Sequence, residues 1–195
     1  MHMVVCVHMQ EPKLVIFCAP SGAGKTTITR RMMALFPELA FSISATNREP
    51  RGTERDGVEY HFVSTGQFKE MAAAGEFVEW EEVYPGRYYG TLRREFDRLA
   101  ALGKTPVFDI DVKGAWNLKQ QFGERALMIF VSAPTEIIIS RLKARATDSP
   151  ESIQVRIDRF PEEMTYADKA DVVVHNIDLE TAVEETRRAL EKFLR

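Results

Sequence analysis

The residues from Ala19 to Thr26 combine glycines with a lysine and a threonine, a composition suited to phosphate binding. They follow an apolar run, residues 14–18, and precede a segment of helical periodicity. In a loop of this kind, backbone N–H groups and the positive end of the next helix hold phosphate oxygens. Lys25 would reach the β- and γ-phosphates of ATP, and the Thr26 hydroxyl would bind Mg²⁺. The predicted ATP-binding loop comprises Ala19, Pro20, Ser21, Gly22, Ala23, Gly24, Lys25, Thr26 and Thr27.

This loop departs from the full phosphate-loop pattern at one position, because Ala19 stands where the pattern has glycine. A Cβ is tolerated there only if the backbone angles are open to ordinary residues. The alternative is a glycine-rich turn that merely caps a helix. Lys25 and Thr26 at the correct offset, between a strand and a helix, favour the nucleotide site.

Two aspartates, Asp109 and Asp111, end a second apolar run that begins at Pro106. At the carboxyl end of a parallel strand they would face the phosphate loop, where Asp109 could support the surroundings of the Mg²⁺ ion. An aspartate in this place can also act only as a helix cap. The neighbouring phosphate loop favours the functional interpretation.

Arg48 and Arg51 lie three positions apart, with Pro50 restraining the chain between them. Two guanidinium groups together with the Tyr60 hydroxyl could hold a phosphate dianion. The alternative is a solvated charged loop without a ligand.

Apolar strand-like runs alternate with helical segments, which is typical of a parallel sheet covered by helices. Strands are expected at residues 14–18, 106–111, 126–131 and 171–175, and helices at 25–36, after 134 and at 179–194. The stretch 41–89 favours a small insert with antiparallel strands and a helix near 67–74. The charged stretch 141–159 favours two helices joined by a mobile tip.

The expected fold is therefore α/β: a parallel sheet of the phosphate-loop NTPase type with flanking helices, a small mixed α+β insert and a helical lid. We expect a flexible lead-in at 1–12 and one domain at 13–195. Its core would comprise 13–40, 92–135 and 160–195, with the insert at 41–91 and the lid at 136–159.

The composition of the 195 residues narrows the class of protein. A formal net charge of −3 gives no support to nucleic-acid binding. The two cysteines favour a reducing compartment, and Cys18 is expected to be a buried thiol. No apolar run approaches the roughly 20 residues that a membrane helix needs. We expect a cytoplasmic protein, a monomer or small homo-oligomer, that binds neither nucleic acid nor membrane.

Several linked motifs resemble the guanylate kinase family, in the family's order and over about residues 13–195. Besides the phosphate loop, they include the segments that begin at Ser44 and run through Arg48 and Arg51 to Phe62, then 76–80 and 88–91. The remaining motifs are 109–111 with Gly114, and the arginine-rich stretches 141–145 and 152–156. The resemblance implies transfer of the γ-phosphoryl group of Mg·ATP to GMP, and also to dGMP, giving ADP and GDP.

The resemblance also implies roles for individual residues. Those that would hold the phosphate of GMP are Arg48, Arg51, Tyr60 and Tyr89. Those that would bind the base are Ser44, Glu79, Thr91 and Asp111, with Gly90 in the same matched segment. Guanine offers N1–H and the 2-amino group as adjacent donors, which one carboxylate can accept together. The lid arginines Arg141, Arg145 and Arg156 would join Lys25 and Arg48 as catalytic residues by neutralising charge in the transition state.

Two rival functions differ in the residues they require. A phosphate-loop kinase for another acceptor, such as a phosphorylated sugar, would not need the Glu79 and Ser44 pair. A non-catalytic guanylate-kinase-like binding module typically degrades the phosphate loop, whereas Lys25 and Thr26 are present here. Both rivals are disfavoured.

Overall fold

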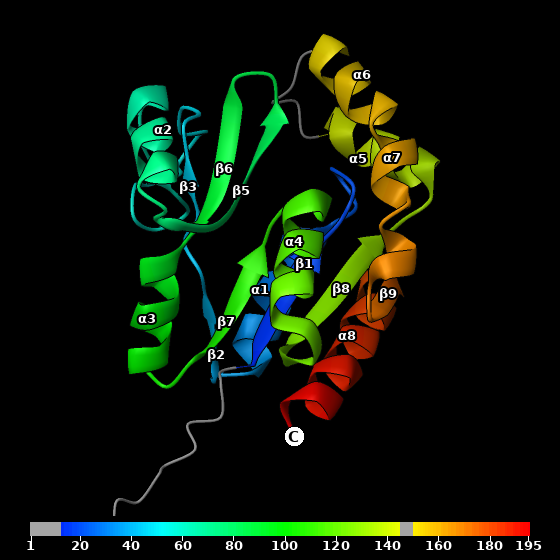
Figure 1. Cartoon of the computed structure of the whole chain (residues 1–195). Helices are drawn as coiled ribbons and strands as arrows, with labels where there is room; N and C mark the ends of the chain where they lie inside the picture. The colour runs from blue at the N-terminus through cyan, green and yellow to red at the C-terminus, as the bar shows by residue number, and fades with distance from the viewer. Residues whose placement is uncertain (1–12, 145–149) are drawn as a thin grey trace, which may run out of the picture.

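The computed structural model describes residues 13–144 and 150–195, which form a large and a small β-sheet with their helices (Figure 1). The large sheet has the strand order β2-β7-β1-β8-β9, with all pairs parallel. Its strands are β1 (Leu14–Cys18), β2 (Leu39–Phe41), β7 (Thr105–Asp109), β8 (Ala126–Ser132) and β9 (Val172–His175). The expected α/β fold is confirmed. The edge strand β2 was not predicted, because three residues between two turns give almost no periodic signal.

Alternate residues of β1 explain why helices cover both faces of this sheet. Val15 and Phe17 pack with α1 (Lys25–Leu35) and α8 (Leu179–Leu194) on one face. Leu14, Ile16 and Cys18 pack with α4 (Val112–Phe122) on the other, next to α3 (Arg93–Ala101). Burial on both faces is typical of parallel strands and requires a continuous apolar run.

Cys18 is the buried thiol that its apolar surroundings predicted. It is 0% exposed and free of any disulfide within the described residues. Burial raises the pKa of the thiol to about 12, so the side chain stays protonated and packs as a small apolar group.

The small sheet forms the insert, in the order β4-β3-β6-β5. Its elements are β3 (Ala45–Thr46), β4 (His61–Phe62), α2 (Thr65–Ala73), β5 (Phe77–Tyr84) and β6 (Arg87–Leu92). β6 is antiparallel to β3 and β5, as expected, but β3 and β4 pair in parallel, which the sequence analysis did not foresee. A capping box made by Ser64 and Gln67 begins α2, and Phe68 fills the centre of the sheet's apolar side.

Helices α5 (Thr135–Ala144), α6 (Pro150–Asp158) and α7 (Phe160–Met164) lie at the end of the large sheet where the β5–β6 hairpin also points (Figure 1). Ile138 and Leu142 anchor α5 in the core. Short 3₁₀ turns occupy Gly123–Arg125 and Ala167–Lys169. The lid tip and Arg145, like the lead-in 1–12, lie outside the described residues. Among the helices that are described, none is both long and apolar enough to cross a membrane.

Candidate active site

The phosphate loop turns sharply between β1 and α1, and glycines make this turn possible. Gly22 and Gly24 have φ angles of 95° and 94°, which ordinary residues rarely adopt. A Cβ on Gly24 would also collide with the amide nitrogen of Asn176. Ala19, in contrast, is only 8% exposed, and its methyl group belongs to the apolar core on the α1 side of the sheet. A side chain at that position therefore has a place to pack.

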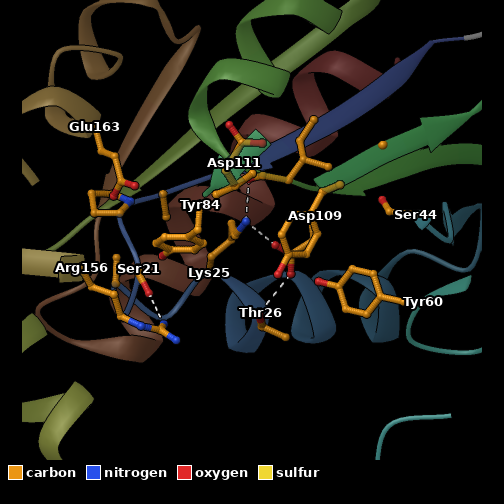
Figure 2. A pocket seen from close by; sticks show the side chains of 18 of the residues that line it. Ser21, Lys25, Thr26, Ser44, Tyr60, Tyr84, Asp109, Asp111, Arg156 and Glu163 are labelled. Carbon is orange, nitrogen blue, oxygen red and sulfur yellow. Dashed lines mark hydrogen bonds and ion pairs between the residues drawn. The ribbon is translucent and has the colours of Figure 1, made fainter. Parts of the chain in front are cut away.

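Lys25, Thr26 and Asp109 form a connected set at the start of α1 (Figure 2). Lys25 Nζ lies 2.5 Å from Asp109 Oδ1 and donates to the Ile110 carbonyl at 2.7 Å. Thr26 Oγ1 donates to Asp109 Oδ2 at 3.0 Å. Burial alone would lower the pKa of Lys25, but the Asp109 carboxylate outweighs burial and raises it. The lysine therefore carries its positive charge beside the loop.

Asp111 combines the two roles that its sequence position suggested. Its Oδ1 accepts from the backbone N–H of Lys113 at 2.8 Å and of Gly114 at 3.2 Å, so it caps α4. It also lines the same cavity as Lys25.

Glu79 is a buried carboxylate on β5 that lines the same cavity. It is 8% exposed, and Thr91 Oγ1 donates to its Oε1 at 2.6 Å. Burial raises the pKa of Glu79 to about 8 against the opposing effect of this hydrogen bond. Gly114 makes room for the carboxylate, because a Cβ there would lie 2.6 Å from Glu79 Oε2. Nearby Ser44 is buried as well, at 7% exposure.

The structure separates the two arginines that were expected to act together. Arg51 lines the cavity, but Arg48 is not among the lining residues. Its Nη1 and Nη2 donate to the Glu54 carboxylate at 2.6 and 2.8 Å, and its guanidinium lies 4.8 Å from the centre of the Tyr60 ring. Arg48 Nε is buried without a hydrogen-bond partner among the described residues. Tyr60 and Tyr89 both line the cavity, with ring centres 6.0 Å apart.

Two of the arginines predicted for a lid, Arg141 and Arg156, approach the phosphate loop from the other side. Arg156 Nη1 donates to Ser21 Oγ at 2.6 Å. Arg141 donates to the Ala23 carbonyl at 3.2 Å and to the Asn176 carbonyl at 3.1 Å. Arg141 therefore supports the back of the loop, whereas Arg156 lies at the cavity itself.

One cavity of about 260 Å³ brings these groups together. In Figure 2, Ser21, Tyr84, Arg156 and Glu163 lie to one side of Lys25, and Ser44 and Tyr60 to the other. The predicted residues that line the cavity are Ala19, Pro20, Ser21, Gly22, Ala23, Lys25, Thr26, Ser44, Arg51, Tyr60, Glu79, Tyr89, Gly90, Asp109, Asp111 and Arg156. The predicted residues that do not line it are Gly24, Thr27, Arg48, Thr91 and Arg141.

Four lining residues were not predicted: Val83, Tyr84, Ile110 and Glu163. Ile110 contributes its carbonyl, which carries no side-chain signal. Glu163 is 7% exposed, and burial raises its pKa although Arg159 opposes this. In the sequence it is one of many charged residues of its region, and only its burial distinguishes it.

The chain matches known proteins over nearly its whole length. The model of the family described as guanylate kinase matches residues 11–193. The guanylate kinase of Salinibacter ruber is 48% identical over 187 residues, which cover 95% of this chain and 99% of that protein. The guanylate kinase of Bacteroides thetaiotaomicron is 49% identical, covering 93% and 90%.

A solved structure shares the fold. The crystal structure of guanylate kinase from Anaplasma phagocytophilum superposes with a TM-score of 0.70 at 24% identity, covering 94% of this chain and 85% of that one. The family match and the relatives in sequence confirm the resemblance that the motifs suggested. The chain belongs to the guanylate kinase family, the enzymes that phosphorylate GMP to GDP with ATP.

Proposed function

We propose that the cavity binds Mg·ATP at the phosphate loop and GMP toward the insert, and transfers the γ-phosphoryl group between them. One observation carries this proposal: a charged phosphate loop and a buried carboxylate for the base line the same cavity. The donor phosphates and the acceptor base would occupy opposite ends of it. The transferred group would then pass beside the Lys25 ammonium, which Asp109 holds in place.

The donor end suits a magnesium nucleotide. Thr26 Oγ1 and Asp109 Oδ2 lie 3.0 Å apart and offer a hydroxyl and a carboxylate oxygen. Mg²⁺ commonly takes few protein ligands and completes its octahedron with water and phosphate oxygens. The residues fit this pattern, with Thr26 as a direct ligand and Asp109 supporting it. The ion would neutralise phosphate charge.

For the acceptor phosphate we assign Arg51, Tyr60, Tyr89 and Arg48. Arg51 and the two tyrosines line the cavity and can reach a dianion there. Arg48 is held by Glu54 against the Tyr60 ring, and its Nε–H is one of the donors left for a phosphate. The Glu54 carboxylate thereby fixes the orientation of the Arg48 guanidinium and does not take the place of the acceptor phosphate.

For the base we assign Glu79 together with Ser44, Thr91 and Asp111. A charged Glu79 can accept from both N1–H and the 2-amino group of guanine. Adenine lacks both donors and would leave a buried carboxylate unpaired, which costs several kcal/mol. Gly114 and Thr91 place the carboxylate at the cavity wall, and this packing favours guanine over other bases.

The transfer itself needs no general base, because the acceptor phosphate is already an anion. Its oxygen attacks the γ-phosphorus of ATP in line, the bond to the β-phosphate oxygen breaks, and ADP leaves. The protein contributes position and positive charge. Lys25 and Arg156 act at the phosphates, Arg141 supports the loop from behind, and the resemblance adds Arg145 from the lid.

An acceptor panel tests this assignment. ADP release is measured with Mg·ATP and, separately, GMP, dGMP, AMP, CMP and UMP. We expect turnover with GMP and dGMP and at least about 10²-fold lower kcat/KM with AMP. Equal turnover of AMP would contradict the base pocket. ATP binding without turnover of any of these acceptors would contradict the acceptor class.

We also propose that the protein works in the cytoplasm as a monomer or small homo-oligomer, with 41–91 and 136–159 moving as insert and lid against the core. The free thiol of Cys18 suits a reducing compartment. Sedimentation of the purified protein with and without nucleotides tests both the oligomeric state and the decrease in hydrodynamic size that the movement would cause.

A further inference from the structure

Arg159 lies between α6 and α7 and contacts the insert from the lid side. Its Nη1 donates to the carbonyl of Val83, near the end of β5. Its guanidinium carbon is 4.7 Å from the centre of the Tyr84 ring, within the range of a cation–π contact. The side chain is 17% exposed, so both contacts are made largely out of water. Figure 1 shows the β5–β6 hairpin pointing toward these helices.

The same side chain also reaches toward the phosphate loop through Glu163. Arg159 Nε lies 3.3 Å from Glu163 Oε1. Glu163 lines the cavity beside Ser21, whose backbone N–H favours its charged form (Figure 2). Glu163 Oε2 is buried without a hydrogen-bond partner among the described residues. Arg156, on the same lid segment, donates to the Ser21 hydroxyl.

We propose that Arg159 is a positioning residue that couples occupancy of the acceptor insert to the geometry of the phosphate loop. The contacts run from Val83 and Tyr84 through Arg159 and Glu163 to Ser21. This inference rests on the proposed function, because it takes GMP to bind on the insert side and ATP at the loop. Arg159 is not among the residues that line the cavity, so it acts through its neighbours.

The physical basis is that both nucleotides favour one arrangement. Tyr84 belongs to the insert, at the end of β5, and Glu163 belongs to α7; both line the cavity on the Ser21 side of Lys25 (Figure 2). A nucleotide that holds Tyr84 or Glu163 in place lowers the free-energy cost of forming the Arg159 contact with the other residue. Binding of each nucleotide therefore strengthens binding of the other by the same factor, as linkage requires. Contacts alone do not prove coupling, so the coupling itself must be measured.

The experiment measures the Kd of GMP by calorimetry without and with saturating Mg·ADP, which fills the donor site and cannot transfer a phosphoryl group to GMP. In the full-length wild-type protein we expect Mg·ADP to tighten GMP about fivefold or more. In Arg159→Ala the tightening should fall to less than about twofold. Arg159→Lys keeps the charge but loses the planar stacking of the guanidinium on Tyr84. Its tightening of GMP by Mg·ADP should lie between that of the wild type and that of Arg159→Ala.

Arg31→Ala is the matched control. Arg31 joins α1 to α8 through a bidentate pair with Glu180 and does not line the cavity. It should keep the wild-type coupling. Tyr84→Leu should lower the coupling, and adding Arg159→Ala to it should lower it little further. Thermal unfolding of each variant confirms that it is folded.

Coupling of wild-type size in Arg159→Ala, or none in the wild type, would overturn the inference. Equal losses of coupling in Arg31→Ala and Arg159→Ala would also overturn it, because they would show that the coupling falls with any general loss of stability. Failure of the proposed function is distinguishable, because the wild-type protein would then not turn over GMP at all.

Discussion

The two sides of the cavity that we assign to the donor and to the acceptor are built in different ways. The phosphate loop connects β1 to α1, and β1 is fully buried between β7 and β8. Lys25 and Thr26 both contact Asp109, at the end of the neighbouring strand β7. The site is therefore held by a short piece of chain and a rigid sheet.

The acceptor side draws on distant residues and short strands. β3 and β4 have two residues each, and the loop between them, to which we assign the acceptor phosphate, is largely exposed. Arg48 is held by Glu54 within that loop, whereas Glu79 is buried against Thr91 and Gly114. This side carries a buried acid whose pKa is raised by burial.

The two sides suit two different recognition tasks. Phosphates are common to all nucleotides, and backbone N–H groups with one lysine suffice to bind them. A particular base requires a polar group that is desolvated before the ligand arrives, and such a group must be buried by tertiary packing. We expect substitutions on the donor side to affect rate and those on the acceptor side to affect selectivity.

The largest effect should come from Lys25→Ala. Because the ammonium would stabilise charge that develops during transfer, kcat should fall about 10³-fold while the protein stays folded. Steady-state ADP release checks this. Lys119→Ala is the matched control, because Lys119 makes a similar pair with Asp171 away from the cavity. A kcat within threefold of wild type in Lys25→Ala would break the donor assignment.

Glu79→Gln should change selectivity. An amide accepts only one of guanine's two donors and presents its own N–H groups to the other, so kcat/KM for GMP should fall about 10- to 100-fold. The KM for ATP should stay unchanged. Glu81→Gln, two residues along β5 and bonded to Asn117, controls for changes in the strand. An unaltered ratio of GMP to AMP turnover would show that Glu79 does not bind the base.

The pH dependence of GMP binding should follow Glu79. Its pKa of about 8 in the free protein means that the carboxylate is mostly protonated near neutral pH, whereas guanine requires the charged form. The KM for GMP should therefore fall as pH rises from 6.5 to about 8, by up to about tenfold per pH unit, and level off above. Glu79→Gln should show a flat profile, and a flat wild-type profile would contradict the argument.

Linkage gives the opposite sign for the stability of the free protein. The pKa of Glu79 is raised above its ordinary value of 4.5 on folding, so the native state binds the extra proton. The contribution of this group to the free energy of unfolding is fully present below about pH 4.5 and is lost as pH rises toward about 8. Comparing wild type with Glu79→Gln by chemical denaturation isolates it.

The smallest effect is expected for Glu54→Gln. Without the carboxylate, Arg48 loses its fixed orientation, and the KM for GMP should rise about three- to tenfold with little change in kcat. Glu70→Gln, on the exposed face of α2, is the control. A lower KM would instead show that Glu54 competes with the phosphate for Arg48.

Much of the donor side was predictable from sequence because its signals are local. The strand at 14–18 and the helix at 179–194 have the predicted bounds. Two helices were predicted for 141–159; α6 lies within this stretch, whereas α5 begins earlier, at Thr135. β2, the parallel pairing of β3 with β4 and the wall formed by Tyr84 and Glu163 were missed. Each of these features depends on which segment, distant in the sequence, packs beside it in the fold.

A phosphate loop with Lys25 and Thr26 after a buried strand could be predicted from the sequence, because contiguous residues carry both the turn and the periodicity. The sequence also identified the family through motifs in order. Only the tertiary structure decided that Glu54 holds Arg48 and that Glu79 is buried beside Gly114. Spacing along the chain carries no information about burial or partners when the contacting residues come from different elements, since packing alone brings them together.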